Sequence, residues 1–108
     1  MNIQFTDNSK EVSDNIKAAL LRGLETCGLV AEGYAKKLAP VDTGNLRNSI
    51  THEVDDGEPA ASIGTNVEYA PYQELGTIHM KAQPFLKPAV ADHANEYRKI
   101  IEKELKNG

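Results

Sequence analysis

The segment PVDTGNLRNSI, residues 40–50, separates a long helical pattern from the first strand pattern of the chain. Pro40 lacks a backbone N–H and disfavours helical geometry at the residue before it, so a helix should end there. Asp42 and Thr43 carry side-chain acceptors that cap turns, and Gly44 can adopt positive φ. The segment therefore predicts a corner at which a helix ends and a strand begins directly.

The pattern before this corner predicts one long amphipathic helix over residues 9–38. Asn8 and Glu11 have the spacing of a capping box at its start. At about 1.5 Å per residue this helix would span about 45 Å, too long for a compact domain with a radius of gyration of about 13 Å. The apolar stripe consists of Val12, Ile16, Leu20, Leu24, Cys27, Ala31, Tyr34 and Leu38.

Such a helix has two ways to fit its domain, and the sequence leaves both open. It can bend at its glycines, which are Gly23, Gly28 and Gly33. Alternatively it protrudes, and a neighbouring subunit covers the overhang. Three apolar residues off the main stripe favour a second contact surface of this kind: Leu21, Leu29 and Val30.

Alternating patterns after the corner predict a hairpin. In residues 46–54, Ile50, His52 and Val54 share one face, and Ser49, Thr51 and Glu53 share the other. DDGEP, residues 55–59, is a turn cluster. In residues 60–67, the positions that share one side are Ala61, Ile63, Thr65 and Val67, and Gly64 suggests a bulge or a close backbone approach. Residues 1–7 alternate loosely and predict an edge strand or an ordered arm.

The last third of the chain predicts two helices joined by a surface loop. Residues 68–77 fit a short helix with Pro71 in its first turn and Gly76 at its C′ position. Residues 78–88 contain two prolines and no clear period, which is typical of a loop. An amphipathic helix starts near Pro88, and its apolar positions are Leu86, Val90, Ala94, Tyr97, Ile101 and Leu105.

These elements predict one α+β domain over residues 1–108, with a long N-terminal helix and a C-terminal helix packed on a small antiparallel β-sheet. Hydrophobic residues make up 40% and charged residues 26%, which suits a chain that buries a single core. No apolar run reaches the ~18–20 residues of a membrane span. The N-terminus lacks the pattern of a signal peptide. We therefore expect neither a membrane span nor a signal peptide.

The charge balance argues against nucleic-acid binding. A formal net charge of −4 is the opposite of a broad basic surface. Tyr69, Tyr72 and Phe85 could form a stacking platform for bases, but packing in the core or an interface explains them better. The single cysteine, Cys27, cannot form an internal disulfide, which suits a reducing compartment.

No residue set predicts catalysis, a metal or a cofactor. His52, His79 and His93 do not have the spacing of zinc ligands. His93 and Glu96 lie one helical turn apart, but two ligands are too few for a metal site. Cys27 lies on the apolar stripe, where a buried and unreactive thiol is expected. The sequence also lacks a phosphate-binding loop and a nucleophile elbow, so we expect no enzyme.

Three segments in this order resemble one family of proteins: PVDTGNLRNSI, IGTNVEYAPYQELGT and QPFLKPAV. The chain looks like the small head–tail connector or tail-completion proteins of long-tailed bacteriophages, which are related to the lambda minor tail protein Z. The resemblance covers almost the whole chain and departs from the family at residues 78–80, IHM. The lambda protein is longer, so its details are not transferred.

The resemblance implies a non-enzymatic virion assembly protein that forms homo-oligomeric rings, commonly hexamers. Its partners would be its own copies, the phage connector and the tail tube proteins, with no small-molecule substrate. It would assemble in the host bacterial cytoplasm and end in the virion.

In this reading the first helix contacts a neighbouring subunit, and the loop 76–88 reaches an adjacent subunit or a partner ring. Gly76 and Pro84 would fix the loop ends, and Phe85 and Leu86 would anchor it to the core. The corner at residues 40–50 has two possible roles. It either only caps the first helix and turns the chain, or it also makes a direct contact within the ring. The candidate interface residues are Leu21, Leu29, Val30, Asp42, Thr43, Gly44, Tyr72, Gly76, Met80, Pro84 and Phe85.

Two readings from other classes stay open. A host-encoded protein-interaction adaptor or regulator is the first, although no basic groove or recognition helix is evident. An enzyme is the second, and a pocket with convergent polar groups would support it.

Overall fold

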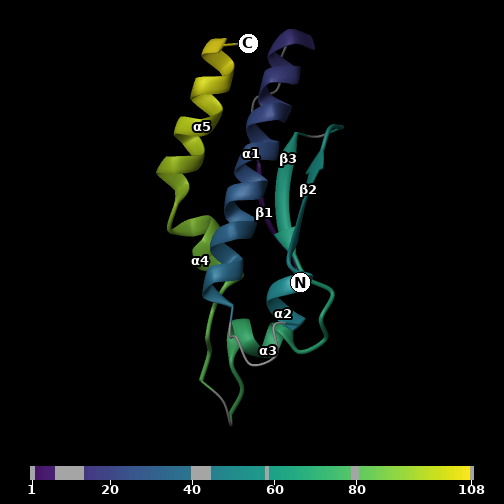
Figure 1. Ribbon diagram of the computed structural model, residues 1–108, viewed down its shortest axis with the longest axis vertical. Helices are drawn as coiled ribbons and strands as arrows, with labels where there is room; N and C mark the ends of the chain where they lie inside the picture. The colour runs from purple at the N-terminus through teal and green to yellow at the C-terminus, as the bar shows by residue number, and fades with distance from the viewer. Residues whose placement is uncertain (1, 7–13, 40–44, 58, 79–80, 108) are drawn as a thin grey trace.

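The computed structural model describes residues 2–6, 14–39, 45–57, 59–78 and 81–107 (Figure 1). These residues form three strands and five helices in an α+β fold, as predicted. In chain order they are β1 (Asn2–Thr6), α1 (Asp14–Leu38), α2 (Asn45–Ser49), β2 (Thr51–Asp55), β3 (Ala60–Gly64), α3 (Ala70–Leu75), α4 (Leu86–Ala91) and α5 (Ala94–Asn107).

The strands form one antiparallel sheet in the order β1-β3-β2. Ile63, in the central strand, is the register partner of Ile3 in β1 and of His52 in β2. The predicted hairpin and the predicted N-terminal edge strand are therefore both confirmed. Along β2, His52 and Val54 are half-buried, whereas Thr51, Glu53 and Asp55 are exposed, so the predicted alternation is also confirmed.

α1 is the central element, with α5 on one side and the sheet on the other (Figure 1). Gly23 meets Ile101 of α5, and Glu32 hydrogen-bonds His52 of β2. These two α1 positions are nine residues apart, and at about 100° per residue they face opposite ways. The C-terminal helix therefore joins the fold mainly through α1.

The domain is elongated along α1. Its Cα extents are 50 × 22 × 21 Å and its radius of gyration is 15.1 Å, whereas a compact domain of this length would have about 13 Å. The sequence-based assumption of a compact domain, shorter than its first helix, is therefore wrong. The rest of the chain spreads along that helix. Contact between α1 and a neighbouring subunit stays a prediction. The predicted capping box at Asn8 and Glu11 lies outside the described residues.

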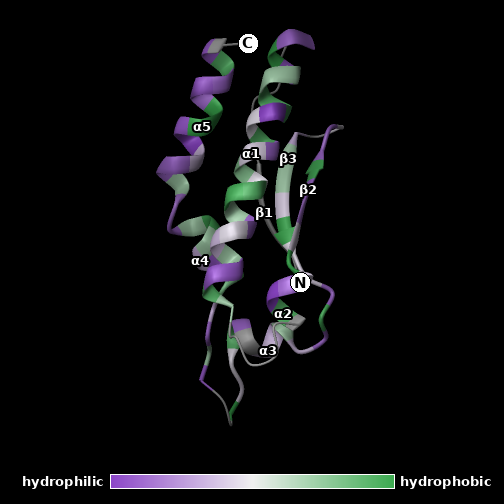
Figure 2. Cartoon of the chain, in the orientation of Figure 1, coloured by the Kyte–Doolittle hydropathy of each residue, from purple (hydrophilic) through white to green (hydrophobic). Residues whose placement is uncertain are grey.

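The core follows the middle of the predicted α1 stripe. Leu20, Leu24, Cys27 and Ala31 are buried, whereas Ile16 and Leu38 at its two ends are about half exposed. The largest fully buried side chains are Phe85, Leu24, Ile50, Ile63 and Leu86. In Figure 2, α5 is largely hydrophilic, with hydrophobic residues at intervals along it. None of the described helices is long and apolar enough to cross a membrane.

The strand predicted to begin at residue 46 is wrong, because α2 precedes it. Leu46 and Ile50 are both buried, whereas Asn48 between them is exposed, which suits a helix and not an alternating strand, where all three would share one face. The Ser49 hydroxyl donates to the Leu46 carbonyl at 2.7 Å, and Arg47 Nε donates to the Lys36 carbonyl at 3.1 Å. The second bond ties α2 to the end of α1. The corner residues 40–44 lie outside the described residues.

Two further predicted elements differ in length. β3 ends at Gly64 rather than at residue 67, because the Thr65 hydroxyl accepts the Val67 N–H at 3.2 Å in place of a strand partner. The predicted C-terminal helix is divided into α4 and α5 by a turn at Asp92 and His93. The Tyr97 hydroxyl donates to the Ala89 carbonyl and so ties the two helices together across that turn.

Candidate interaction surfaces

A buried carboxylate organises the end of the molecule that carries α3. Glu74 is only 5% exposed. Its Oε1 accepts the backbone N–H groups of Phe85 and Leu86 at 3.1 and 2.8 Å, and its Oε2 accepts that of Lys87 at 3.3 Å. The first N–H groups of a helix have no partner within that helix, so a carboxylate there is favourable. Glu74 therefore caps α4 and ties the end of α3 to the start of α4, at the two ends of the predicted loop.

The loop is fixed at both of its ends. Gly76 has φ 78° and donates its N–H to the Tyr72 carbonyl at 2.8 Å, which ends α3 where the sequence predicted. Phe85 is fully buried in the core at the other end of the loop. The role of Glu74 could not be predicted from the sequence, because an acidic residue in a short helix has no local feature that marks it as buried.

The same end exposes several apolar side chains. Tyr72 is 58% exposed, Leu75 is 73% exposed and Ile78 is 94% exposed. Leu75 also lines a groove of about 430 Å³, together with Pro84, Pro88 and other residues. Exposed apolar patches of this kind mark interaction sites more often than scattered single residues do. We call Tyr72, Leu75, Ile78 and Pro84 the α3 end surface.

A histidine between two carboxylates joins α1 to β2. His52 Nδ1 lies 3.1 Å from Glu32 Oε1, and His52 Nε2 lies 2.6 Å from Glu25 Oε1. A Cβ atom at Gly28 would lie 2.8 Å from the His52 ring. The close approach of the ring to α1 therefore requires glycine at position 28.

The carboxylates favour the protonated form of His52. Burial opposes the imidazolium, but hydrogen bonds and charges from Glu25 and Glu32 outweigh it and raise the pKa of His52. Burial likewise opposes ionisation of Glu32, but hydrogen bonds from His52 and Lys36 leave its pKa lower than usual. The two ring nitrogens are both engaged, on separate carboxylates. Among the described residues no His, Cys, Asp and Glu side chains converge as metal ligands.

The predicted His93 and Glu96 pair contributes to the contact between α1 and α5. The His93 ring stacks on Tyr34 of α1 with centroids 3.6 Å apart. The Tyr34 hydroxyl lies 2.7 and 2.8 Å from the two Glu96 oxygens, and this hydrogen bond raises the pKa of Tyr34. Both residues therefore bind across the helix interface.

Cys27 lies at the centre of the same interface. It is fully buried, as predicted, and its Sγ lies 3.6 Å from the Tyr97 carbonyl oxygen. Burial, with a smaller contribution from the charge of Glu96, raises the pKa of Cys27 to about 11. The thiolate is therefore disfavoured at neutral pH.

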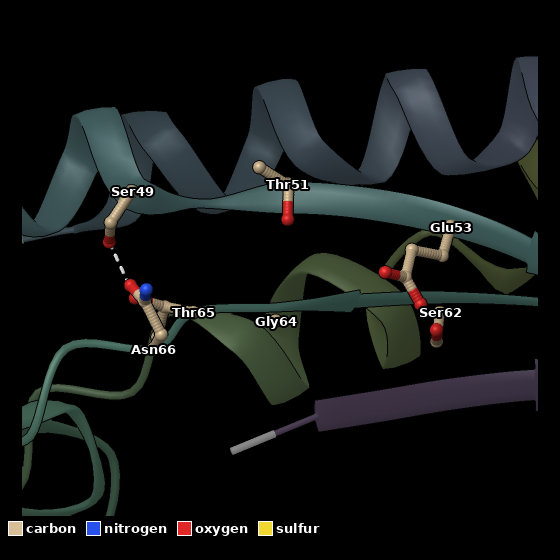
Figure 3. Close-up of a pocket in the computed structure, with 7 residues that line it drawn as sticks. All are labelled: Ser49, Thr51, Glu53, Ser62, Gly64, Thr65 and Asn66. Atoms are coloured by element: carbon tan, nitrogen blue, oxygen red, sulfur yellow. Dashed lines mark hydrogen bonds between the residues drawn. The ribbon is translucent and has the colours of Figure 1, made fainter.

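The sheet has a second face that the described helices leave open. This face carries a hollow of about 300 Å³ (Figure 3). Thr51 is the register partner of Gly64, which has no side chain, and Glu53 is the partner of Ser62. Small residues beside Thr51 and Glu53 thus create the hollow. Its lining is polar and consists of Ser49, Thr51, Glu53, Ser62, Gly64, Thr65 and Asn66.

The structure places the predicted interface residues in different environments. Leu29 and Tyr72 are exposed, whereas Leu21 and Val30 are partly buried against the core. Pro84 is exposed in the loop, but Phe85 is fully buried and presents no side-chain surface to a partner. Those outside the described residues are Asp42, Thr43, Gly44 and Met80. Participation of these residues in an interface stays a prediction.

The burial of Phe85 also bears on the alternative of a stacking platform for bases. Tyr69 and Tyr72 are exposed, but Phe85 belongs to the core and cannot share a surface with them. The three aromatic residues therefore do not form one platform. His79, a candidate in the search for metal ligands, lies outside the described residues.

Comparison with known proteins gives one family. The family described as "Bacteriophage HK97-gp10, putative tail-component" matches residues 3–76, which is more than half of the chain. The match begins within β1 and ends at Gly76, at the C-terminus of α3. A search of curated proteins and a search of solved structures each found no match. The chain belongs to this HK97-gp10-like family of phage tail components.

Proposed function

We propose that this member of the HK97-gp10-like family is a non-enzymatic structural protein that acts at the head–tail junction or the tail terminus of a phage or prophage particle. The observation that carries the proposal is the family match over residues 3–76. The resemblance to head–tail connector and tail-completion proteins, and through them to lambda minor tail protein Z, supports this position. In this proposal the protein assembles in the host cytoplasm and remains in the virion.

The α3 end surface supports a docking role at one end of the subunit. Leu75 and Pro84 lie at the two ends of the segment that Glu74 spans by its bonds to the start of α4, so these side chains are presented on a fixed frame. A preorganised surface loses less conformational entropy on binding than a disordered one. We assign this end to contact with the connector or tail tube proteins, and the flanks of the domain to contacts within a homo-oligomeric ring.

Deletion of the reading frame from its parent phage or prophage tests this function. After induction, negative-stain electron microscopy should show filled heads beside unattached tails, or tails of abnormal length. Normal infectious particles from the deletion would overturn the proposal and favour a host-encoded adaptor.

Complementation of the deletion tests the assignment of the α3 end surface. Leu75→Glu places a charge in this surface and should fail to restore joined particles, because apolar contact with the partner is lost. Ile16→Glu, a similar change at an exposed apolar residue near the start of α1, is the control and should restore them. Full complementation by Leu75→Glu would show that the α3 end surface is not needed for contact with the partner.

A further inference from the structure

We propose that neighbouring copies of this chain contact each other side by side, with the outward face of α5 on one copy docked on the open face of the sheet on the next. This inference rests on the proposed function, in which copies form a ring. It adds the two surfaces that meet and the chemistry that joins them.

The outward face of α5 carries a row of lysines. Lys99, Lys103 and Lys106 are all exposed. At about 100° per residue they lie on the side of α5 opposite Tyr97 and Ile101, which contact α1. None of these lysines forms an ion pair with another described residue. We call Lys99, Lys103 and Lys106 the basic row.

The other carboxylates of α5 leave this row largely uncompensated. Glu104 pairs with Arg22 of α1 at 3.4 Å, and Glu96 accepts the Tyr34 hydroxyl. Both acidic side chains are therefore directed toward α1. Glu102 is the remaining carboxylate of α5 and is exposed. The outward face of this helix thus carries a net positive charge on a chain whose overall net charge is −4.

The open face of the sheet has the opposite charge. Glu53 and Asp55 are exposed on β2 and alternate with the residues that face α1, and Asp56 follows them in the turn. No lysine or arginine occurs in residues 48–80, so no nearby cation of this segment neutralises them. Figure 3 shows Glu53 beside the hollow, and Ser49 and Thr65 at its edge. Glu53, Asp55 and Asp56 form the acidic face.

The hollow has the right chemistry for a lysine side chain. An ammonium group donates three hydrogen bonds and needs acceptors around it. The Glu53 carboxylate and the hydroxyls of Thr51 and Ser62 are acceptors of this kind. The long aliphatic stem of lysine would fill space that Gly64 leaves empty.

The two surfaces also match in spacing and position. Lys99 and Lys103 are separated by about 6 Å along a helix, and Glu53 and Asp55 by about 7 Å along a strand. Figure 1 shows α5 and the β2–β3 hairpin on opposite flanks of α1, with overlapping heights along it. One copy can therefore offer its basic row to one neighbour and its acidic face to the other. Such a head-to-tail contact closes into a ring when the rotation between copies allows it.

Charge reversal on each surface tests the contact. Lys99→Glu with Lys103→Glu makes the row acidic, and Glu53→Lys with Asp55→Lys makes the sheet face basic. Sedimentation velocity over a range of protein concentrations at low salt should show assembly of the parent chain. For either double variant, the dissociation constant of assembly should be at least about tenfold higher. Lys17→Glu with Lys81→Glu makes the same change in net charge as the Lys99 and Lys103 variant, but elsewhere, and should assemble like the parent. Circular dichroism should confirm that every variant folds.

Restoration of opposite charges gives the decisive result. A mixture of the two double variants, and the quadruple variant that combines them, should both regain assembly. Three results would overturn the contact: a parent chain that stays monomeric at the highest concentration, reversal without effect, or no recovery in the mixture. Electron microscopy of the deletion phage tests the proposed function separately, so failure of the contact and failure of the function can be told apart.

Discussion

At the scale of single residues, the side chains that hold the fold together are mostly ones with no marked pattern in the sequence. Glu74 closes a loop by accepting backbone N–H groups from the start of α4. His52 joins β2 to α1 through Glu25 and Glu32. In each case a polar group is satisfied by a partner at least eleven residues away along the chain, so local pattern alone cannot reveal it.

Glu74→Gln should destabilise the fold by about 1–3 kcal/mol, because the charged acceptor of three backbone N–H groups, two of them buried, is replaced by an amide with a single acceptor oxygen. Urea denaturation measures the free energy of unfolding. Glu68→Gln, at an exposed position two residues before α3, is the control and should stay within about 0.5 kcal/mol of the parent. Equal stability of the two variants would show that the Glu74 cap contributes nothing.

The His52 contact should make stability depend on pH. Its pKa is raised by folding, so its contribution is complete below the ordinary value of 6.5 and is lost as pH rises through the folded pKa. The pKa of Glu32 is lowered by folding, so its contribution is complete above its ordinary value of 4.5 and is lost as pH falls through the folded pKa. The pair should therefore stabilise the fold most between these two values.

Urea denaturation of the parent and of His52→Gln measures this dependence. The difference in unfolding free energy between the two should be larger at about pH 5.5 than at about pH 8.5. A constant difference across this range would mean that folding does not raise the pKa of His52.

At the scale of elements, α1 has glycines with different roles. A Cβ at position 28 would collide with the His52 ring, whereas a Cβ at position 33 would meet nothing within 4 Å. Gly28→Ala should destabilise the fold by about 1–3 kcal/mol, because the ring is held by two carboxylates and cannot shift freely. Gly33→Ala should instead stabilise it by up to about 1 kcal/mol through helix propensity. Thermal denaturation of both variants checks the signs, and a stabilising Gly28→Ala would contradict the packing.

The sequence predicted the elements whose pattern is local and missed those that tertiary contacts decide. The long helix, the hairpin and the end of α3 at Gly76 follow from periodicity and turn residues. The helix at Asn45–Ser49 was missed because Leu46 and Ile50 fit both a helix and a strand, and only the exposure of Asn48 between them distinguishes the two. The break before α5 was missed because the stack of His93 on Tyr34 joins residues far apart in the chain.

The candidate surfaces could be predicted only in part. Tyr72 and Pro84 were expected in an interface and are exposed, but Phe85 in the same segment belongs to the core. The hollow beside Glu53 depends on which residues pair across the hairpin. That register cannot be read from alternation alone, since a shift of two residues keeps the same alternation.

At the scale of the whole molecule, the chain is an elongated subunit with three distinct surfaces. One end exposes apolar side chains of and near α3, one flank is basic and the opposite flank is acidic. In our proposal the end contacts phage partners and the flanks contact neighbouring copies. This arrangement explains how a small domain with one core could join a larger assembly.

We propose that this protein is part of the phage particle at the head–tail joint or tail terminus. Immunogold labelling of purified, infectious virions with an antibody against this chain tests it most directly. Gold particles should be confined to the neck or the end of the tail, and mass spectra of the same preparation should contain peptides of the chain. Infectious virions that carry neither the label nor the peptides would contradict it.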